Sequence, residues 1–157
     1  MLVRPAAAQD LPAIQSIYAH HVLNGLASFE EEAPPLEEMR RRYEEITGRG
    51  LPYLVAEEKG EILGYGYCSL YRARSAYRFT LEDSIYVKNG RQGKGIGNML
   101  MDYCIDIARK VELKSVWMEI LKENRRMIKF GFKYGFRQAY DDGDMVKVVL
   151  GLEQPVK

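Results

Sequence analysis

Cysteine is scarce in this sequence, which has two cysteines and one tryptophan among its 157 residues. Cys68 and Cys104 lack the spacing of metal ligands or of a redox pair, so we expect two buried thiols and no metal site. No apolar run approaches the roughly 20 residues that cross a bilayer, and the first residues lack the basic-then-apolar pattern of a secretory signal. These absences predict a cytoplasmic protein with no membrane partner.

An excess of either charge is also missing, because 23 basic residues nearly balance 22 acidic ones and leave a formal net charge of +1. Without a field of one sign, nothing draws the chain to nucleic acid, and we expect no nucleic-acid partner. The two histidines, His20 and His21, are adjacent in sequence. On a helix they would point about 100° apart, which is a poor arrangement for sharing a metal.

Hydrophobic residues make up 46% of the chain, which suffices for one core, but the length leaves no room for two ordinary domains. We therefore predict a single domain over residues 1–157. Periodicity indicates helices, the first capped by Asp10, and short apolar runs indicate strands. The expected helices span about 10–24, 36–48, 95–110 and 124–134, and the expected strands span 53–57, 61–70, 79–87, 115–120, 136–139 and 145–150. This mixture predicts an α/β or α+β fold with helices on a central sheet.

A glycine-rich turn between the strand at 79–87 and the helix at 95–110 is the most informative stretch of the chain. Its glycines are Gly93, Gly95 and Gly97. Glycines let a phosphate approach the backbone, and the start of a helix offers unpaired N–H groups and a favourable dipole. Cationic side chains at Lys88, Arg91 and Lys94 add local positive charge. The turn therefore predicts a pyrophosphate ligand.

Three phosphate-binding patterns compete for this turn. A P-loop needs Ser or Thr after Gly-Lys to hold magnesium, whereas Lys94 is followed by Gly95, so that pattern fails. A dinucleotide-binding turn needs a different glycine spacing near the start of a βαβ unit, but more than half of the chain precedes this one. If the turn binds no phosphate at all, it is a flexible turn with solvated lysines.

The third pattern, Gln92-x-x-Gly95-x-Gly97, resembles the Gln/Arg-x-x-Gly-x-Gly/Ala signature of the GNAT superfamily of N-acetyltransferases. A second likeness lies at Asn124 and at Gly135 with the phenylalanine that follows, where the family has a helix that begins with asparagine and ends in Gly-Phe. These two residues also have a capping interpretation, Asn124 at the start of the helix and Gly135 past its end. Both interpretations are compatible.

Within the superfamily the chain is most similar to the phosphinothricin and methionine sulfoximine N-acetyltransferase branch. The segments that carry this likeness are 17–22, 27–32, 53–57 and 72–84. The resemblance implies the GNAT fold, an α/β (α+β) arrangement of a central mixed, mostly antiparallel sheet of six to seven strands flanked by about four helices. It also implies a homodimer, for which no heptad or long apolar stripe gives independent support.

The resemblance implies acetyl-CoA as the cofactor. In the family, backbone groups of a central strand pair with the pantetheine arm, and amides of the glycine turn hold the pyrophosphate. The corresponding residues here are Ile85, Tyr86 and Val87 on the strand, Gln92, Gly93, Lys94, Gly95, Ile96, Gly97 and Asn98 in the turn, and Asn124. Strand amides would polarise the thioester carbonyl, so direct transfer without a covalent enzyme intermediate is expected.

Glu82 is the expected general base. A primary ammonium group has a pKa near ~10 and must lose a proton before it can attack a thioester. Glu82 lies on the strand just before the glycine turn, and it matches the glutamate assigned as the base in the phosphinothricin branch. The alternative is an ordinary strand carboxylate that faces water.

The acceptor is expected to be a small-molecule amine resembling an amino acid. Guanidinium groups bind a carboxylate in bidentate fashion, and aromatic walls hold a side chain. The residues that match the branch's acceptor pocket are Phe29, Glu30, Arg72, Arg74 and Tyr77. Each of them has an alternative role as a surface or packing residue. Residues 30–32, all glutamate, would instead suit a polyamine or an aminoglycoside, and a protein N-terminus is a further alternative.

Two departures from the branch weaken the match. Gly131 stands where many members have a tyrosine, and the branch often a histidine, that serves the departing thiolate. Protonation of the leaving group is therefore unassigned, with water, Tyr134 or Tyr140 as candidates. A short turn at 138–144 replaces a longer branch segment that closes the acceptor site. An inactive acyl-CoA-binding sensor is the rival from another functional class.

Overall fold

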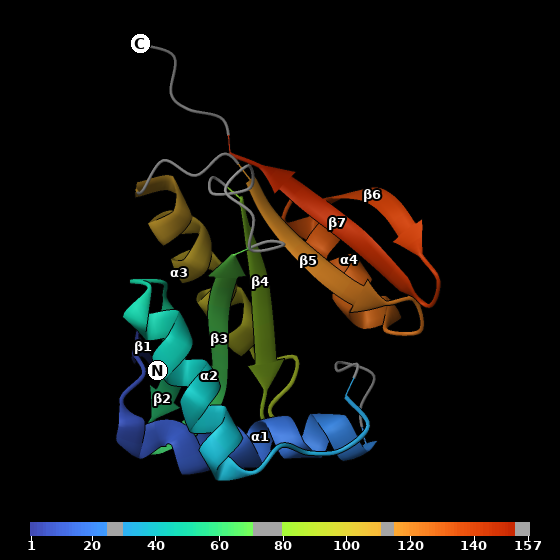
Figure 1. Cartoon of the computed structure of the whole chain (residues 1–157). Coiled ribbons are helices and arrows are strands. Elements are labelled where there is room, and N and C mark those ends of the chain that lie inside the picture. The colour runs from blue at the N-terminus through green and yellow to red at the C-terminus, as the bar shows by residue number, and fades with distance from the viewer. Residues whose placement is uncertain (25–29, 71–79, 111–114, 153–157) are drawn as a thin grey trace. The chain divides into compact units, whose positions relative to one another are not determined.

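The computed structural model describes residues 1–24, 30–70, 80–110 and 115–152, which form four α-helices and seven strands (Figure 1). In chain order the elements are β1 (Leu2–Pro5), a 3₁₀ turn (Ala8–Asp10), α1 (Leu11–Asn24), α2 (Leu36–Gly48), β2 (Tyr53–Glu58), β3 (Glu61–Leu70), β4 (Thr80–Val87), α3 (Ile96–Lys110), β5 (Ser115–Leu121), α4 (Arg125–Lys133), β6 (Arg137–Asp142) and β7 (Met145–Gly151). No helix in these ranges is long and apolar enough to span a membrane.

The strands follow the order β1-β2-β3-β4-β5-β7-β6. The pairs β1–β2, β2–β3, β5–β7 and β6–β7 are antiparallel, whereas β4 and β5 run parallel. The predicted fold class, a mixed and mostly antiparallel sheet with helices, is therefore confirmed. The chain divides into two compact units, one of residues 1–68 and 84–104 and the other of residues 69–83 and 105–157.

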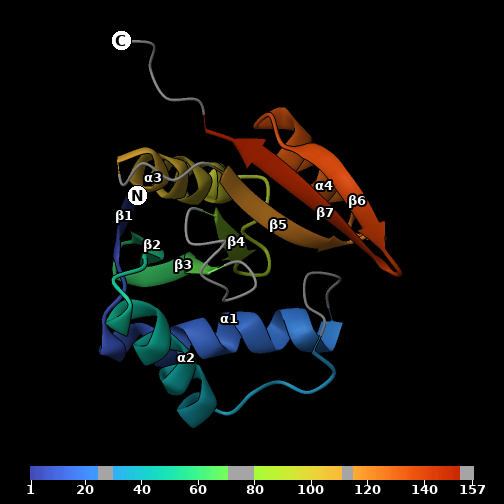
Figure 2. The same cartoon turned by 45° about the horizontal axis from the view of Figure 1, so that its top comes forward.

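The first unit packs helices on both faces of β2 and β3. Helices α1 and α2 lie side by side on one face, and α3 begins on the other (Figure 2). The buried side chains between α1, α2 and the strands are Leu11, Ile14, Ile17, Tyr18, Met39, Ile46, Tyr53, Val55, Ile62 and Tyr65. Both helices therefore bury the amphipathic stripe that their sequences predicted.

Close packing between β3 and α3 depends on a glycine. A Cβ added to Gly64 would lie 2.9 Å from Cγ2 of Ile96 and 3.1 Å from the carbonyl oxygen of Tyr86. Since real Cβ atoms do not approach so closely, any larger residue at this position would push the first turn of α3 away from the strand. Gly64 thus sets the position of the helix that follows the glycine turn.

Strand β1 and the role of Asp10 were not predicted correctly. Asp10 was expected to cap α1, but its buried carboxylate accepts hydrogen bonds from the guanidinium of Arg4 at 2.8 and 2.9 Å and from the amide of Ala7 at 2.7 Å. Arg4 also donates to Glu57 of β2 at 2.7 Å. Long-range ion pairing therefore holds β1, whose four residues show no strand pattern of their own.

The second unit contains a three-stranded antiparallel array of β5, β7 and β6, together with α4 (Figure 1). Side chains of β5 alternate, with Val116, Met118 and Ile120 buried and the residues between them half-buried. Asn124 caps α4 by accepting a hydrogen bond from the amide of Met127 at 3.2 Å. Gly135 follows the helix with a φ of +94°, as its capping interpretation predicted.

Candidate functional site

The glycine turn has a backbone conformation that side chains disfavour. Gly90, Gly93 and Gly95 have φ values of +86°, +80° and +84°, in the left-handed region where residues with a Cβ are strained. A Cβ at Gly90 or Gly95 would meet nothing within 4 Å, so conformation rather than crowding selects glycine there. Helix α3 begins directly after this turn. The N–H groups and the dipole at the start of a helix make a site suited to an anion.

Two of the three cationic side chains around the turn are already paired with a carboxylate. Lys88 and Arg91 both pair with Glu61 of β3, the second at 3.4 Å. Lys94 is exposed. The side-chain oxygen of Gln92 accepts a hydrogen bond from the Gly90 amide at 2.9 Å. Gln92 therefore shapes the turn through its side chain.

Other predicted cofactor residues occupy the end of β4 and the first turn of α3. The half-buried side chains of Ile85, Tyr86 and Val87 lie on the strand, and Gly97 and Asn98 are half-buried at the start of the helix. The side chain of Ile96 is buried against β3. Its contribution to an anion site is therefore limited to its backbone.

Glu82 lies in the second unit, where β4 pairs with β5 and Glu82 stands opposite Trp117. The carboxylate is half-buried, and this burial, together with the negative charge of Glu119, raises its pKa to about 7, although Lys147 acts in the opposite direction. Such a group keeps its proton to a higher pH than a solvent-exposed glutamate does. The alternative of an ordinary carboxylate facing water does not fit this environment.

Glu119 and Lys147 belong to this site although sequence reasoning missed both. They stand opposite each other in the β5–β7 ladder, and Lys147 Nζ lies 2.9 Å from Glu119 Oε1. The Lys147 side chain is only 8% exposed. Alternation along β5 would have placed Glu119 on the face of Trp117. Its pairing with a lysine 28 positions later is a tertiary contact that no local pattern indicates.

Gly131 is buried in α4 where the helix meets β5. A Cβ at this position would lie 3.2 Å from Cε of Met118 and 3.7 Å from Cβ of Phe136. The first distance is tight and the second is an ordinary contact, so a side chain at position 131 would require the flexible end of Met118 to shift. Gly131 therefore lies at a closely packed position between the helix and β5.

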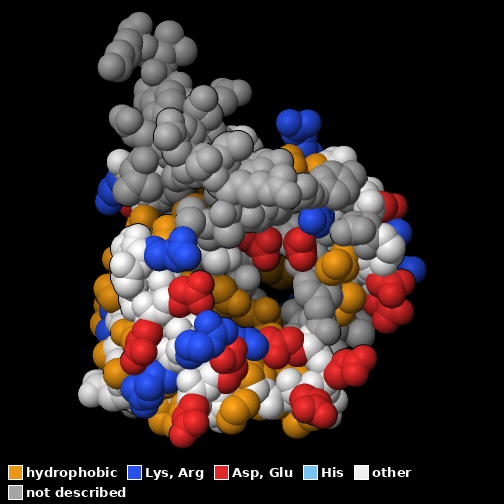
Figure 3. Space-filling model, in the orientation of Figure 1, with side chains coloured by type: hydrophobic (Ala, Val, Ile, Leu, Met, Phe, Trp, Pro, Cys, Tyr) orange, Lys and Arg blue, Asp and Glu red, His pale blue; other side chains and the backbone are white. Residues whose placement is uncertain are grey.

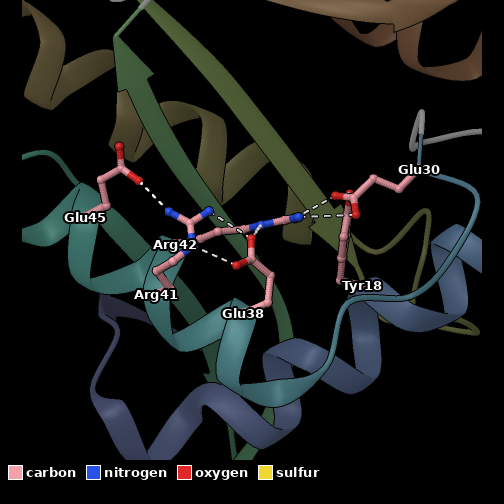
Figure 4. A network of polar contacts seen from close by, with 6 residues as sticks. All are labelled: Tyr18, Glu30, Glu38, Arg41, Arg42 and Glu45. Atoms are coloured by element: carbon pink, nitrogen blue, oxygen red, sulfur yellow. Dashed lines mark hydrogen bonds and ion pairs between the residues drawn. The ribbon is translucent and has the colours of Figure 1, made fainter.

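Four of the predicted acceptor residues, Phe29, Arg72, Arg74 and Tyr77, lie outside the described residues. The fifth, Glu30, is part of an ion-pair network (Figure 4). Its Oε1 accepts hydrogen bonds at 2.6 Å from both the Tyr18 hydroxyl and the Arg42 guanidinium, and Arg42 also reaches Oε2 at 3.3 Å. Partial burial acts to raise the pKa of Glu30, but these hydrogen bonds outweigh it and leave the pKa below its ordinary value.

The network continues along α2. Glu38 accepts hydrogen bonds from Arg42 at 2.8 Å and from Arg41 at 2.7 Å, and Arg41 also reaches Glu45 at 3.1 Å (Figure 4). Acidic and basic side chains are mixed on the surface over α2 (Figure 3). The negative charge of Glu30 is therefore balanced by the positive charge of Arg42. The sequence pattern did not identify Arg42.

Comparison with known proteins agrees with the turn and the fold. The model of the acetyltransferase (GNAT) family matches residues 15–136. The chain belongs to this family.

Individual relatives point to the branch that the sequence resembled. The chain is 56% identical over 99 residues to a phosphinothricin N-acetyltransferase of Alcaligenes faecalis, a match that covers 63% of this chain and only 50% of that relative. It is 33% identical to an L-methionine sulfoximine/L-methionine sulfone acetyltransferase of Salmonella typhimurium, over 87% of this chain and 80% of the relative. A crystal structure of a phosphinothricin acetyltransferase from Sinorhizobium meliloti in complex with acetyl-CoA matches with a TM-score of 0.91 and 34% identity, covering 99% of this chain and 93% of that one.

The charges beside Glu82 give a prediction about its titration. Glu119→Gln removes a like charge, so the pKa of Glu82 should fall below about 7, whereas Lys147→Met removes a cation and should raise it. Carboxyl-carbon NMR titration of Glu82 in the two variants measures both shifts. Thermal melting serves as a control, because Glu119→Gln removes a carboxylate that pairs with a buried lysine. Shifts in the same direction, or a wild-type Glu82 that titrates like an exposed glutamate, would contradict this account.

Proposed function

We propose that this chain is an acetyl-CoA-dependent N-acetyltransferase that acts on the primary amine of a small amino-acid-like acceptor of the phosphinothricin or methionine sulfoximine type. Family membership and the relatives named above support the reaction and the acceptor class. The observation that carries the catalytic part is the half-buried Glu82, whose pKa of about 7 suits a base at neutral pH. On this proposal residues 1–157 act as one domain, in the cytoplasm. A homodimer rests on resemblance alone.

The cofactor part of the proposal rests on the glycine turn. Acetyl-CoA supplies an acetyl group activated as a thioester. Amides of residues 92–98 would hold its pyrophosphate, and backbone groups of residues 85–87 would pair with its pantetheine arm. The open space at Gly95 and the start of α3 directly after the turn fit this ligand. Asn124 would contribute from the start of α4 while still capping that helix.

Glu82 has a defined part in the proposed reaction. The acceptor arrives as an ammonium ion, and Glu82 takes one proton so that a lone pair becomes available. The amine nitrogen would then bond to the acetyl carbon as the carbon–sulfur bond broke, and the sulfur would leave as thiolate with the bonding pair. The second proton of the nitrogen would pass to water or to that thiolate as the neutral amide formed. Position 131 offers no side chain to protonate that thiolate, because the residue is glycine.

The Glu30 network takes one of three consecutive glutamates out of the set available to a polycation. A polyamine or aminoglycoside would need exposed negative charge, and Glu30 already accepts hydrogen bonds from Arg42 and Tyr18, which leaves Glu31 and Glu32 as the exposed members of that run. An acceptor that brings its own carboxylate needs cationic groups, which the sequence supplies at Arg72 and Arg74. The inactive-sensor alternative gives no reason for the perturbed pKa of Glu82.

Glu82→Gln tests the proposal directly. It should lower kcat/KM by roughly two orders of magnitude or more while coenzyme A still binds, as calorimetry would measure. In the wild type, kcat/KM should rise as the pH increases through about 7, because the base must lose its proton, and this limb should disappear in the variant. Assays would use phosphinothricin, methionine sulfoximine and spermidine as acceptors.

Glu123→Gln, a change at an exposed carboxylate of the same unit, is the matched control and should leave turnover unchanged. Unaltered turnover in Glu82→Gln would remove Glu82 from the mechanism. A preference for spermidine would overturn the proposed acceptor class.

Two glycines of the turn form a matched pair for testing cofactor binding. Alanine at Gly95 or at Gly90 should cost a similar roughly 1–2 kcal/mol of backbone strain, since both have φ near +85° and open surroundings. Only Gly95 belongs to the proposed pyrophosphate contact. Gly95→Ala should therefore weaken coenzyme A binding about tenfold more than Gly90→Ala at equal loss of stability. Calorimetry and thermal melting measure both quantities, and equal affinities would argue against a pyrophosphate at this turn.

A further inference from the structure

Helix α1 contacts the end of β4 through two residues one turn apart. The ring of Tyr18 packs edge-on against Tyr86, with centroids 5.0 Å apart. One turn later, His21 Nε2 lies 2.7 Å from the carbonyl oxygen of Val87, and its ring is 5.7 Å from that of Tyr86. All four residues belong to the first unit. The helix therefore holds consecutive residues of the strand, one by ring packing and the next by a hydrogen bond.

The bonded carbonyl lies on a particular edge of β4. The amide of Lys88 donates to the carbonyl of Leu63 on β3 at 2.8 Å, and the carbonyl of Tyr86 also faces β3, next to Gly64. Because successive residues of a strand direct their polar groups to opposite edges, the N–H and C=O groups of Val87 point away from β3. His21 thus bonds to the edge that a ligand adding to β4 would use.

The hydrogen bond fixes the tautomer of His21. A carbonyl oxygen only accepts, so Nε2 must carry the hydrogen. Burial lowers the pKa of His21, an effect that the Val87 carbonyl opposes and the neighbouring His20 reinforces, and the net pKa lies below its ordinary value. At neutral pH the ring is therefore neutral and donates through Nε2.

We propose that His21 is a positioning residue for the cofactor: its Nε2–H holds the Val87 carbonyl and thereby orients the end of β4 toward an incoming pantetheine arm. This inference rests on the proposed function, because it assumes that the arm pairs with residues 85–87. Because the N–H and C=O groups of one strand residue share an edge, holding the carbonyl also fixes the direction of the Val87 amide, which the ligand would meet. No residue of α1 was assigned to the cofactor from the sequence.

His21→Phe tests the inference, since it keeps a ring but removes the donor. The KM for acetyl-CoA and the dissociation constant for coenzyme A should each rise about fivefold to tenfold, while kcat at saturating acetyl-CoA and the KM for the acceptor stay unchanged. His21→Gln places an amide N–H where Nε2 was and should restore most of the affinity. The carbonyl-carbon NMR resonance of Val87 should shift in His21→Phe and return toward its wild-type position in His21→Gln.

His20→Phe makes the same chemical change one residue earlier and should leave all of these quantities at their wild-type values. If His21 were only a packing residue, His21→Phe would bind the cofactor normally or lose kcat and thermal stability together, and His21→Gln would give no rescue. Tighter cofactor binding in His21→Phe would mean that the histidine competes with the ligand, which also overturns the inference. Failure of the wild type itself to bind coenzyme A would instead refute the proposed function.

Discussion

Burial of the Glu82 carboxylate beside a second carboxylate is the constraint on which the functional account depends. An ionised group removed from water is unstable unless a cation is near. The nearby cation, Lys147, is paired with Glu119 at 2.9 Å, and it lowers the pKa of Glu82 by less than burial and Glu119 raise it. Glu82 therefore holds a proton up to about pH 7. The β5–β7 register imposes this arrangement, because it sets Glu119 against Lys147 while the β4–β5 register sets Glu82 two residues away.

Strand β4 connects this carboxylate along the chain to the residues proposed to bind the cofactor. The same eight-residue strand carries Glu82 and residues 85–87 and leads into the glycine turn. Its far end is held in the first unit by Tyr18 and His21 of α1 and by packing of α3 over Gly64. The residues that hold the end of β4 in place are thus next to those proposed to bind the cofactor. For a variant at this end of the strand, both the stability and the ligand affinity should be measured.

Local patterns sufficed to predict most of the fold. Helical periodicity located all four helices to within a few residues, and the caps at Asn124 and Gly135 have the expected geometry. The glycine turn was recognisable because positive φ values demand glycine. Strand β1 was missed because its four residues show no strand pattern. It is held by contacts with residues far along the chain, among them the ion pair of Arg4 with Glu57.

Side-chain partners in the candidate site were beyond reach of the sequence for the same reason. The partners of three such residues are distant in the chain, and no local sequence pattern indicates them; these residues are Lys147, Arg42 and His21. For Asp10 the local pattern predicted the wrong partner. The residue stands before α1 as a helix cap would, but its carboxylate pairs with Arg4. Sequence patterns thus located the strand and the turn. The electrostatic environment of Glu82 could not be predicted, because it depends on the registers of β4, β5 and β7.

The decisive measurement is a crystal structure with coenzyme A and an acceptor amino acid bound. The pyrophosphate oxygens should accept hydrogen bonds from amides of residues 92–98. The acceptor nitrogen should lie within about 3 Å of a Glu82 oxygen, or one water away. A pyrophosphate bound elsewhere, or a Glu82 side chain turned away from both the sulfur and the amine, would contradict it.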